Sequence, residues 1–167
     1  GADLRELREE DEEALLLAEG SYVLGVSSFG LANFEESRLH LQTVLDAFLP
    51  ENREAHLSDY VQDPYAIAQS RMALTQIYLG QPELALEAIS RTVDYLNEND
   101  HPMSEAYARY FCAHTSADLG DWDQAAYYLS QMEELFERHS HTYWKHRAMI
   151  LRGRIALEEG DPERSLV

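Results

Sequence analysis

The chain has 167 residues, of which 45% are hydrophobic, and it carries a formal net charge of -18 from 13 basic and 31 acidic residues. This length suits one compact domain or a short repeat array, and the charge argues against nucleic-acid binding by this segment, because contacts to phosphates need Lys and Arg side chains. No apolar run approaches the roughly 18 residues of a membrane helix, and the charged N-terminus is unlike a signal peptide, so we expect a cytoplasmic protein without membrane contact.

Helical patterns follow one another along the chain, and no alternating strand pattern appears. We expect residues 3–10 to be the end of a preceding helix. The predicted helices then cover residues 12–31, 33–48, 64–79, 82–98, 103–119, 122–138 and 142–159, with a short helix from 162. They form hairpins at residues 12–48, 64–98, 103–138 and 142–167, the last of them truncated. The whole chain, 1–167, is therefore predicted to be a single all-α repeat domain.

A short pattern recurs at the turn inside each hairpin. Glycine lies at positions 80, 120 and 160, a period of 40 residues, and Ala32 takes its place in the first hairpin. Glycine ends a helix readily because it adopts the left-handed conformation at little cost. The residues seven before and five after this position are always small, which allows the two helices to cross closely. They are Gly25, Ala73, Ala113 and Gly153 before it, and Ser37, Ala85, Ala125 and Ser165 after it.

This pattern resembles the tetratricopeptide repeat (TPR), which also has a glycine followed by a small residue five positions later. A closer resemblance is carried by the stretches Tyr22–Val26, Gln62–Pro64, His101–Tyr107 and Tyr143–Trp144. They resemble the repeat region that follows the ATPase domain in large bacterial signalling proteins, including those fused to nucleotide cyclases, kinases or transcriptional regulators such as the maltose-regulon activator. The resemblance implies a TPR-like α-solenoid, wound as a right-handed superhelix, that acts as a sensor and scaffold arm. The chain departs from the pattern at Ala32, Ser37 and Ser165, and it lacks a phosphate-binding GxxxxGK(S/T) loop.

The sequence gives little support for catalysis or for a metal site. His139, His141 and His146 cluster near Glu137, but the spacing of the last two histidines does not place them on one helical face. A solvated turn is the preferred interpretation. Cys112 is the single cysteine, which excludes an internal disulfide, and its apolar surroundings indicate a small buried core residue in a reduced intracellular protein. We expect no enzyme activity, no metal and no cofactor.

A binding surface is expected on the first helix of each hairpin, which lines the concave face in the repeat family. By that resemblance, residues ten, six and three positions before the turn residue point toward this face. They are Tyr22, Val26 and Phe29, then Ser70, Leu74 and Ile77, then Tyr110, His114 and Ala117, and finally Ile150, Arg154 and Leu157. The candidate binding residues are Tyr22, Val26, Ser70, Leu74, Tyr110, His114, Arg147 and Arg154. Aromatic anchors with arginine suit peptide or protein recognition. The alternative, that several of these side chains only pack between neighbouring hairpins, stays open.

Two functions remain open. The first is a non-catalytic protein-interaction or scaffold domain of a bacterial signal-transduction or transcriptional regulatory protein. Its partner would be a protein, a peptide or another domain of the parent chain, or a second copy of this chain in a homo-oligomer. Its acidic surface would attract basic partners. The second is a domain that senses a small-molecule or peptide effector. We expect a longer parent chain because the sequence begins with Gly1-Ala2 and stops at Val167, a few residues into a helix.

Overall fold

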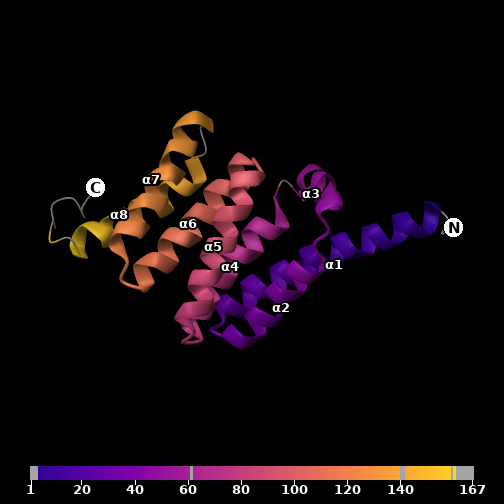
Figure 1. Ribbon diagram of the computed structural model, residues 1–167, viewed down its shortest axis with the longest axis horizontal. Coiled ribbons are helices and arrows are strands. Elements are labelled where there is room, and N and C mark those ends of the chain that lie inside the picture. The colour runs from indigo at the N-terminus through magenta and orange to yellow at the C-terminus, as the bar shows by residue number, and fades with distance from the viewer. Residues whose placement is uncertain (1–3, 61, 140–141, 159, 161–167) are drawn as a thin grey trace.

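The computed structural model describes residues 4–60, 62–139, 142–158 and 160, and these residues form helices and turns without a strand among them. Figure 1 shows the helices following one another across the molecule. They are α1 (Leu4–Gly30), α2 (Phe34–Ala47), the short 3₁₀ helix η1 (Pro50–Asn52), α3 (Arg53–Tyr60), α4 (Pro64–Tyr78), α5 (Pro82–Glu98), α6 (Pro102–Asp118), α7 (Trp122–His139) and α8 (Thr142–Glu158). The all-α prediction is confirmed for this part of the chain. In the same part, no helix has both the length and the apolar character that a membrane crossing requires.

The helices from α4 to α7 begin and end close to their predicted positions. The helices α4, α5 and α6 each start with a proline, because the first helical position needs no amide donor. The Asp63 side chain caps α4 by accepting a hydrogen bond from the amide of Ala66 at 3.3 Å. The helix α8 ends at Glu158, and the short helix predicted from residue 162 lies outside the described residues.

One prediction for the N-terminal third is wrong, and two short helices there were not predicted. The helix α1 runs without interruption from Leu4 to Gly30, whereas residues 3–10 were expected to end a separate helix. The stretch before Gly20 consists mainly of Arg, Glu, Leu and Ala, which favour helix, so nothing ends the helix near residue 11. The connection after α2 contains η1 and α3, which were not among the expected helices, because Arg53–Tyr60 is short and polar.

The turns inside the first three helix pairs share one backbone geometry. The turn residue has a left-handed conformation, with φ of 61° at Ala32, 72° at Gly80 and 79° at Gly120. In each turn, the amide of the next residue donates a hydrogen bond of 2.9 Å to a carbonyl in the last turn of the preceding helix. The donors and acceptors are Asn33 and Ser28, Gln81 and Gln76, and Asp121 and Ser116. This bond satisfies a carbonyl at the end of the helix. The first pair therefore uses the same turn although it has no glycine there.

Small residues lie where the paired helices cross. Fully buried members of this set are Ser37, Ala73, Ala85, Ala113 and Ala125. A Cβ atom added at Gly25 would lie 3.1 Å from Cγ of Leu41, so α1 and α2 approach as closely as these residues permit. Among the other predicted small residues, Gly153 is half-buried, and Ser165 lies outside the described residues.

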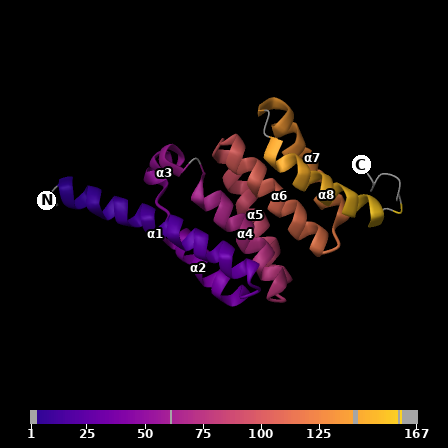
Figure 2. The ribbon, with the colours of Figure 1, turned by 180° about the vertical axis from the view of Figure 1, so that it is seen from behind.

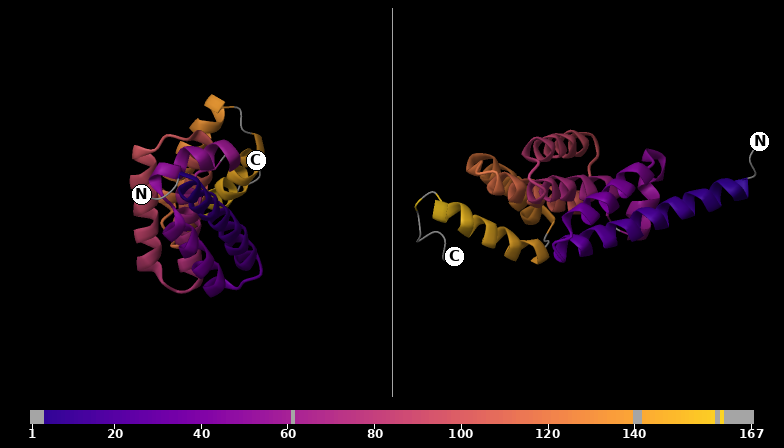
Figure 3. Two further views of the ribbon diagram at one scale, coloured as in Figure 1. Left: turned by 90° about the vertical axis from the view of Figure 1, so that its right-hand side faces the viewer. Right: turned by 90° about the horizontal axis from the view of Figure 1, so that it is seen from below.

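The first helix of each later pair, α4, α6 or α8, packs on the preceding pair. The helix α4 packs against α2, α5 and α6, and α8 packs against α7 and α6. Figure 2 shows the helices in this order from behind. The helix α6 lies on α4 and touches α5 only slightly. The first part of α1 extends past α2 as an arm, as the right-hand view in Figure 3 shows.

Asp63 links four helices at the start of α4. Its carboxylate is 1% exposed and accepts hydrogen bonds from Nε of Arg53 at 2.6 Å and from the hydroxyl of Tyr95 at 2.9 Å. Its amide donates to Oγ of Ser104 at 2.7 Å. Burial, followed by the nearby Asp63 charge, raises the pKa of Tyr95 above its usual value, so the Tyr95 hydroxyl keeps its proton. The junction therefore joins α3, α4, α5 and α6.

Candidate binding site

Four aromatic side chains of α6 and α8 form a continuous ring cluster. They are Tyr107, Tyr110 and Phe111 of α6 and Trp144 of α8. Ring centroids lie 4.8 Å apart for Tyr107 and Phe111, 5.0 Å for Tyr110 and Phe111, and 5.1 Å for Tyr107 and Trp144. The spacing of three and four residues places the α6 rings on one side of that helix. All four side chains are buried, so the cluster provides a rigid base for whatever lies on it.

Arg71 of α4 lies beside this ring cluster. Its Cζ atom is 4.1 Å from the ring centroid of Phe111, and its Nε donates to the hydroxyl of Tyr107 at 2.5 Å. The hydroxyls of Tyr107 and Tyr22 form a hydrogen bond of 2.5 Å, which adds α1 to the arrangement. Burial, followed by the neighbouring Tyr107, raises the pKa of Tyr22 above its usual value, so this phenol is neutral. These contacts fix the orientation of the Arg71 guanidinium.

Arg147 of α8 contacts the same rings. Its Cζ atom is 5.5 Å from the ring centroid of Trp144 and 5.8 Å from that of Tyr110, and its side chain is exposed. A guanidinium within about 6 Å of an aromatic centroid is attracted to the ring. We call the two arginines and these rings the arginine–aromatic cluster. Its members are Arg71, Tyr107, Tyr110, Phe111, Trp144 and Arg147.

Arg71 and Arg147 differ from the other arginines whose side chains the structure describes. The arginines that form an ion pair with a carboxylate are Arg38, Arg53, Arg91, Arg109, Arg138, Arg152 and Arg154. Neither Arg71 nor Arg147 forms an ion pair with a described residue, although the chain has 31 acidic residues. A stacked guanidinium still presents hydrogen-bond donors at its edge. These two arginines are therefore the best placed to receive an anionic group.

Asp118 organises a second polar group on α6. It accepts a hydrogen bond from Nη1 of Arg154 at 2.5 Å and lies 3.3 Å from Nδ1 of His114. The Cζ atom of Arg154 is 5.4 Å from the ring centroid of Trp122. Burial alone would raise the pKa of Asp118, but the interactions with His114 and Arg154 outweigh burial and lower it below its usual value. The rings of His114 and Tyr110 are 6.0 Å apart, so the two groups are neighbours.

The structure brings most of the predicted binding residues into these two groups. Tyr22, Tyr110 and Arg147 contact the ring cluster or belong to it, and His114 and Arg154 lie beside Asp118. Val26 is half-buried on α1. Ser70 and Leu74 are buried, with exposures of 0% and 3%, because α4 is covered by neighbouring helices there.

Four cluster members were not among the predicted binding residues: Arg71, Tyr107, Phe111 and Trp144. Arg71 and Phe111 directly follow the predicted positions Ser70 and Tyr110, on a neighbouring face of the helix. Arg71 is also the only charged residue in α4. A lone charge on a largely buried helix needs a specific partner, and this signal could have identified Arg71 from the sequence.

Metal binding and thiol chemistry find no support in the residues that the structure describes. Those residues contain no group of three or more His, Cys, Asp or Glu side chains that could hold a metal ion. The side chains of His139 and His141, which the sequence placed near a turn, lie outside the described set. Burial raises the pKa of the Cys112 thiol to about 12, so this thiol is protonated and inert at neutral pH.

Comparison with known proteins adds no family. No family model matches the chain, and no curated protein is significantly similar to it. The contacts and charges of the site itself are therefore the basis for its function.

Proposed function

We propose that this chain is a non-catalytic protein-interaction domain that binds a peptide or protein segment through the arginine–aromatic cluster. One observation carries the proposal: Arg71 and Arg147 contact a single ring cluster, and neither has a carboxylate partner among the described residues. The chemical group that suits both arginines is a carboxylate, supplied by an Asp or Glu side chain or by a C-terminus of the partner.

Binding at this cluster would rest on a charged contact held in place by the rings. A guanidinium forms two parallel hydrogen bonds with a carboxylate, which fixes the orientation of the bound group. The rings beside it are buried and held by neighbouring helices, so they keep the guanidinium groups in position before a partner binds. Arginine and large aromatic residues are also enriched among the residues that dominate binding energy.

The overall charge adds a second requirement for the partner. A net charge of -18 attracts basic molecules and repels acidic ones at long range. A partner that brings one carboxylate to the cluster and carries basic residues around it would satisfy both the local and the long-range charges. We expect its association rate to fall as the salt concentration rises.

The arrangement of the helices suggests what kind of protein this domain belongs to. The shared turn geometry and the small residues at the helix crossings support a TPR-like α-solenoid, and its right-handed winding is what the resemblance implies. In the bacterial signalling and transcriptional regulatory proteins that the sequence resembles, such a region is a scaffold arm in the cytoplasm. The partner would then be another protein or another domain of the parent chain.

Selection from a random peptide library displayed on phage tests the proposal. A selected peptide is then titrated by calorimetry against the wild type, Arg147→Ala and Arg91→Ala. Arg91 is the matched control, because it is an exposed arginine of α5 that pairs with Glu87. We expect Arg147→Ala to weaken binding about tenfold or more, since a hydrogen bond to a charged group contributes roughly 1.5–3 kcal/mol. Arg91→Ala should leave binding unchanged.

Two outcomes would overturn the proposal. One is a selection that enriches no peptide, and the other is a peptide that binds the wild type and Arg147→Ala equally well. A thermal-shift assay with small carboxylates, such as citrate and free glutamate, tests the alternative of a small-molecule sensor. A large stabilisation by one of these compounds without any peptide binding would favour the sensor, because a ligand of the folded state raises its stability by mass action.

A further inference from the structure

An apolar stripe on α1 is exposed along one side of the helix. Its exposed members are Leu16 at 65%, Leu17 at 53%, Val23 at 60%, Leu24 at 52% and, just after the helix, Leu31 at 74%. Their spacing of seven and eight residues places them on one face. Gly20 lies within the stripe, and a Cβ atom added there would meet nothing within 4 Å. A second helix could therefore approach this face closely.

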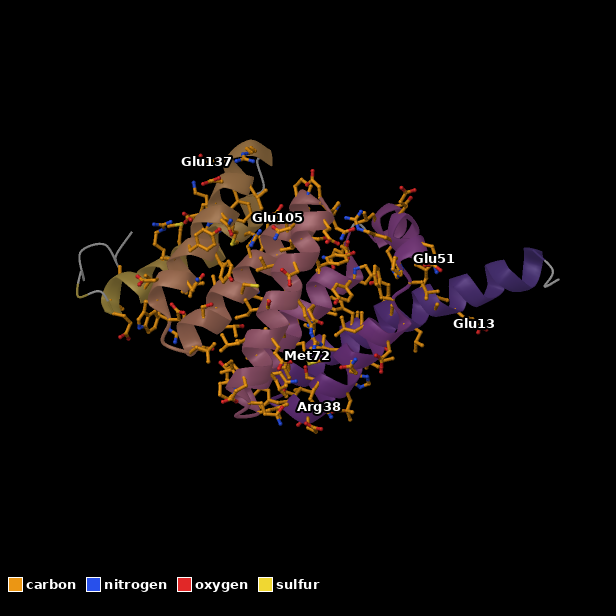
Figure 4. All side chains as sticks on the ribbon, viewed as in Figure 1. Glu13, Arg38, Glu51, Met72, Glu105 and Glu137 are labelled. Carbon is orange, nitrogen blue, oxygen red and sulfur yellow. The ribbon has the colours of Figure 1, made fainter. Side chains whose placement is uncertain are left out.

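The internal repeat shows what kind of element covers such a face. Counted back from the turn residue, Gly20 corresponds to Ala68, Ala108 and Ala148, which are 0%, 0% and 2% exposed. Leu24 corresponds to Met72 of α4, which is 5% exposed and belongs to one core cluster with Leu41 and Val44 of the preceding pair. Figure 4 places Met72 within the body of the molecule and Glu13 on the α1 arm. In the later pairs, helices of the preceding pair cover this face.

The helix α8 carries a complementary exposed face at the other end of the structure. Ile150 is 75% exposed and Leu157 is 58% exposed. In the third pair the position equivalent to Ile150 is Tyr110, whose ring lies 5.7 Å from that of Trp144 in the next pair. In the first pair the position equivalent to Leu157 is Phe29, which contacts Tyr78 of the next pair at 5.4 Å. In both examples the equivalent position contacts the following pair.

The charges of the two helices are also complementary. The helix α1 contains seven acidic and two basic residues, whereas α8 contains four basic residues and one acidic residue. We propose that two copies of this chain associate head to tail, with the exposed face of α8 in one copy packed on the apolar stripe of α1 in the other. By the register of the internal pairs, Ile150 would contact Leu16 of the second copy.

This association is heterologous, because two different surfaces meet. Each added copy leaves one α1 stripe and one α8 face free, so the assembly grows into chains as the protein concentration rises. The inference rests on α1 and α8 and does not depend on peptide binding. Arg147 and Ile150 lie three residues apart on α8, however, so a bound peptide would compete with the second copy.

Sedimentation velocity over a wide concentration range, with two single variants and their mixture, tests the proposal. The wild type should show an average mass that rises with concentration. Leu24→Asp and Ile150→Asp should each remain monomeric, because each has lost one of the two surfaces. Their equimolar mixture should form a dimer and nothing larger, since each variant keeps one intact surface. Leu86→Asp, at a position that is 54% exposed on α5, is the matched control and should associate like the wild type.

Other results would overturn the head-to-tail arrangement. A wild type that stays monomeric at every concentration would do so. A mixture of the two variants that stays monomeric would also overturn it. So would association that is abolished by Leu24→Asp and unaffected by Ile150→Asp, because that result indicates a symmetric contact between two α1 helices. Circular dichroism checks that each variant is folded, and Leu17→Asp replaces Leu24→Asp if the latter unfolds. Peptide titration of the monomeric Leu24→Asp variant separates this inference from the proposed function.

Discussion

Ala32 has a left-handed backbone with φ of 61°, in a position where the other described pairs have glycine. This conformation costs a residue with a Cβ atom roughly 1–2 kcal/mol, and glycine removes that cost. Part of the gain is offset because glycine also makes the unfolded chain more flexible. We expect Ala32→Gly to increase the free energy of unfolding by about 0.5–1 kcal/mol, measured by urea denaturation. Ser90→Gly, in the middle of α5 on its exposed side, is the control and should lower it.

Asp118 gives the protein a pH-dependent contribution to stability. Its pKa in the folded state lies below the usual value, because the interactions with His114 and Arg154 outweigh the effect of burial. Between the folded and the unfolded pKa, the unfolded chain binds more protons, so the contribution is lost as the pH falls through that interval. We expect Asp118→Asn to make thermal stability less sensitive to acid than in the wild type. Equal acid sensitivity of the two proteins would contradict this assignment.

The sequence predicted which helices carry the candidate site better than it predicted the individual residues of that site. The offsets from the turn residue identified Tyr110 and Arg154, because these offsets depend on helical periodicity alone. They could not predict that Ser70 and Leu74 are buried, since their burial depends on how α6 packs on α4. Arg71 was missed for a related reason: its ring partner Phe111 belongs to a different helix.

At the scale of the helices, Asp63 is the strongest single link between elements. Removing a buried partner of an ion pair costs roughly 3–5 kcal/mol, because the other charge remains buried. Arg53 is 19% exposed, which reduces this cost, so we expect Asp63→Ala to lower the free energy of unfolding by about 3 kcal/mol. Asp63→Asn keeps the shape of the side chain and should cost less. Glu87→Gln, in an exposed ion pair with Arg91, is the control and should change little.

Helix boundaries were predictable where the chain carries a local signal. Pro64, Pro82 and Pro102 begin helices, and Gly80 and Gly120 end them, so α4 to α7 lie near their predicted positions. The start of α1 carries no such signal, because its first residues all favour helix. The short helix α3 was missed because its stability comes from contacts such as that between Arg53 and Asp63, which link it to α4.

The described residues form two main core clusters, and both contain residues of α4 and α6. One contains residues of α4, α6, α7 and α8, and the other contains residues of α1, α2, α4, α5 and α6. Because α4 belongs to both, we expect the chain to unfold in a single cooperative step. The fluorescence of the only tryptophans, Trp122 and Trp144, reports on the first cluster. Far-ultraviolet circular dichroism reports on all helices. The two denaturation curves should coincide, and separated midpoints would show that the clusters unfold independently.

We propose that the arginine–aromatic cluster receives the carboxylate of a partner. Trp144 belongs to this cluster and becomes the only tryptophan in a Trp122→Phe variant. The most direct test is the fluorescence of Trp144 in this variant during titration with a peptide from the library selection. We predict a saturable change in its emission that disappears when Arg147→Ala is added to the variant. Peptide binding detected by calorimetry without any change in Trp144 emission would contradict the claim.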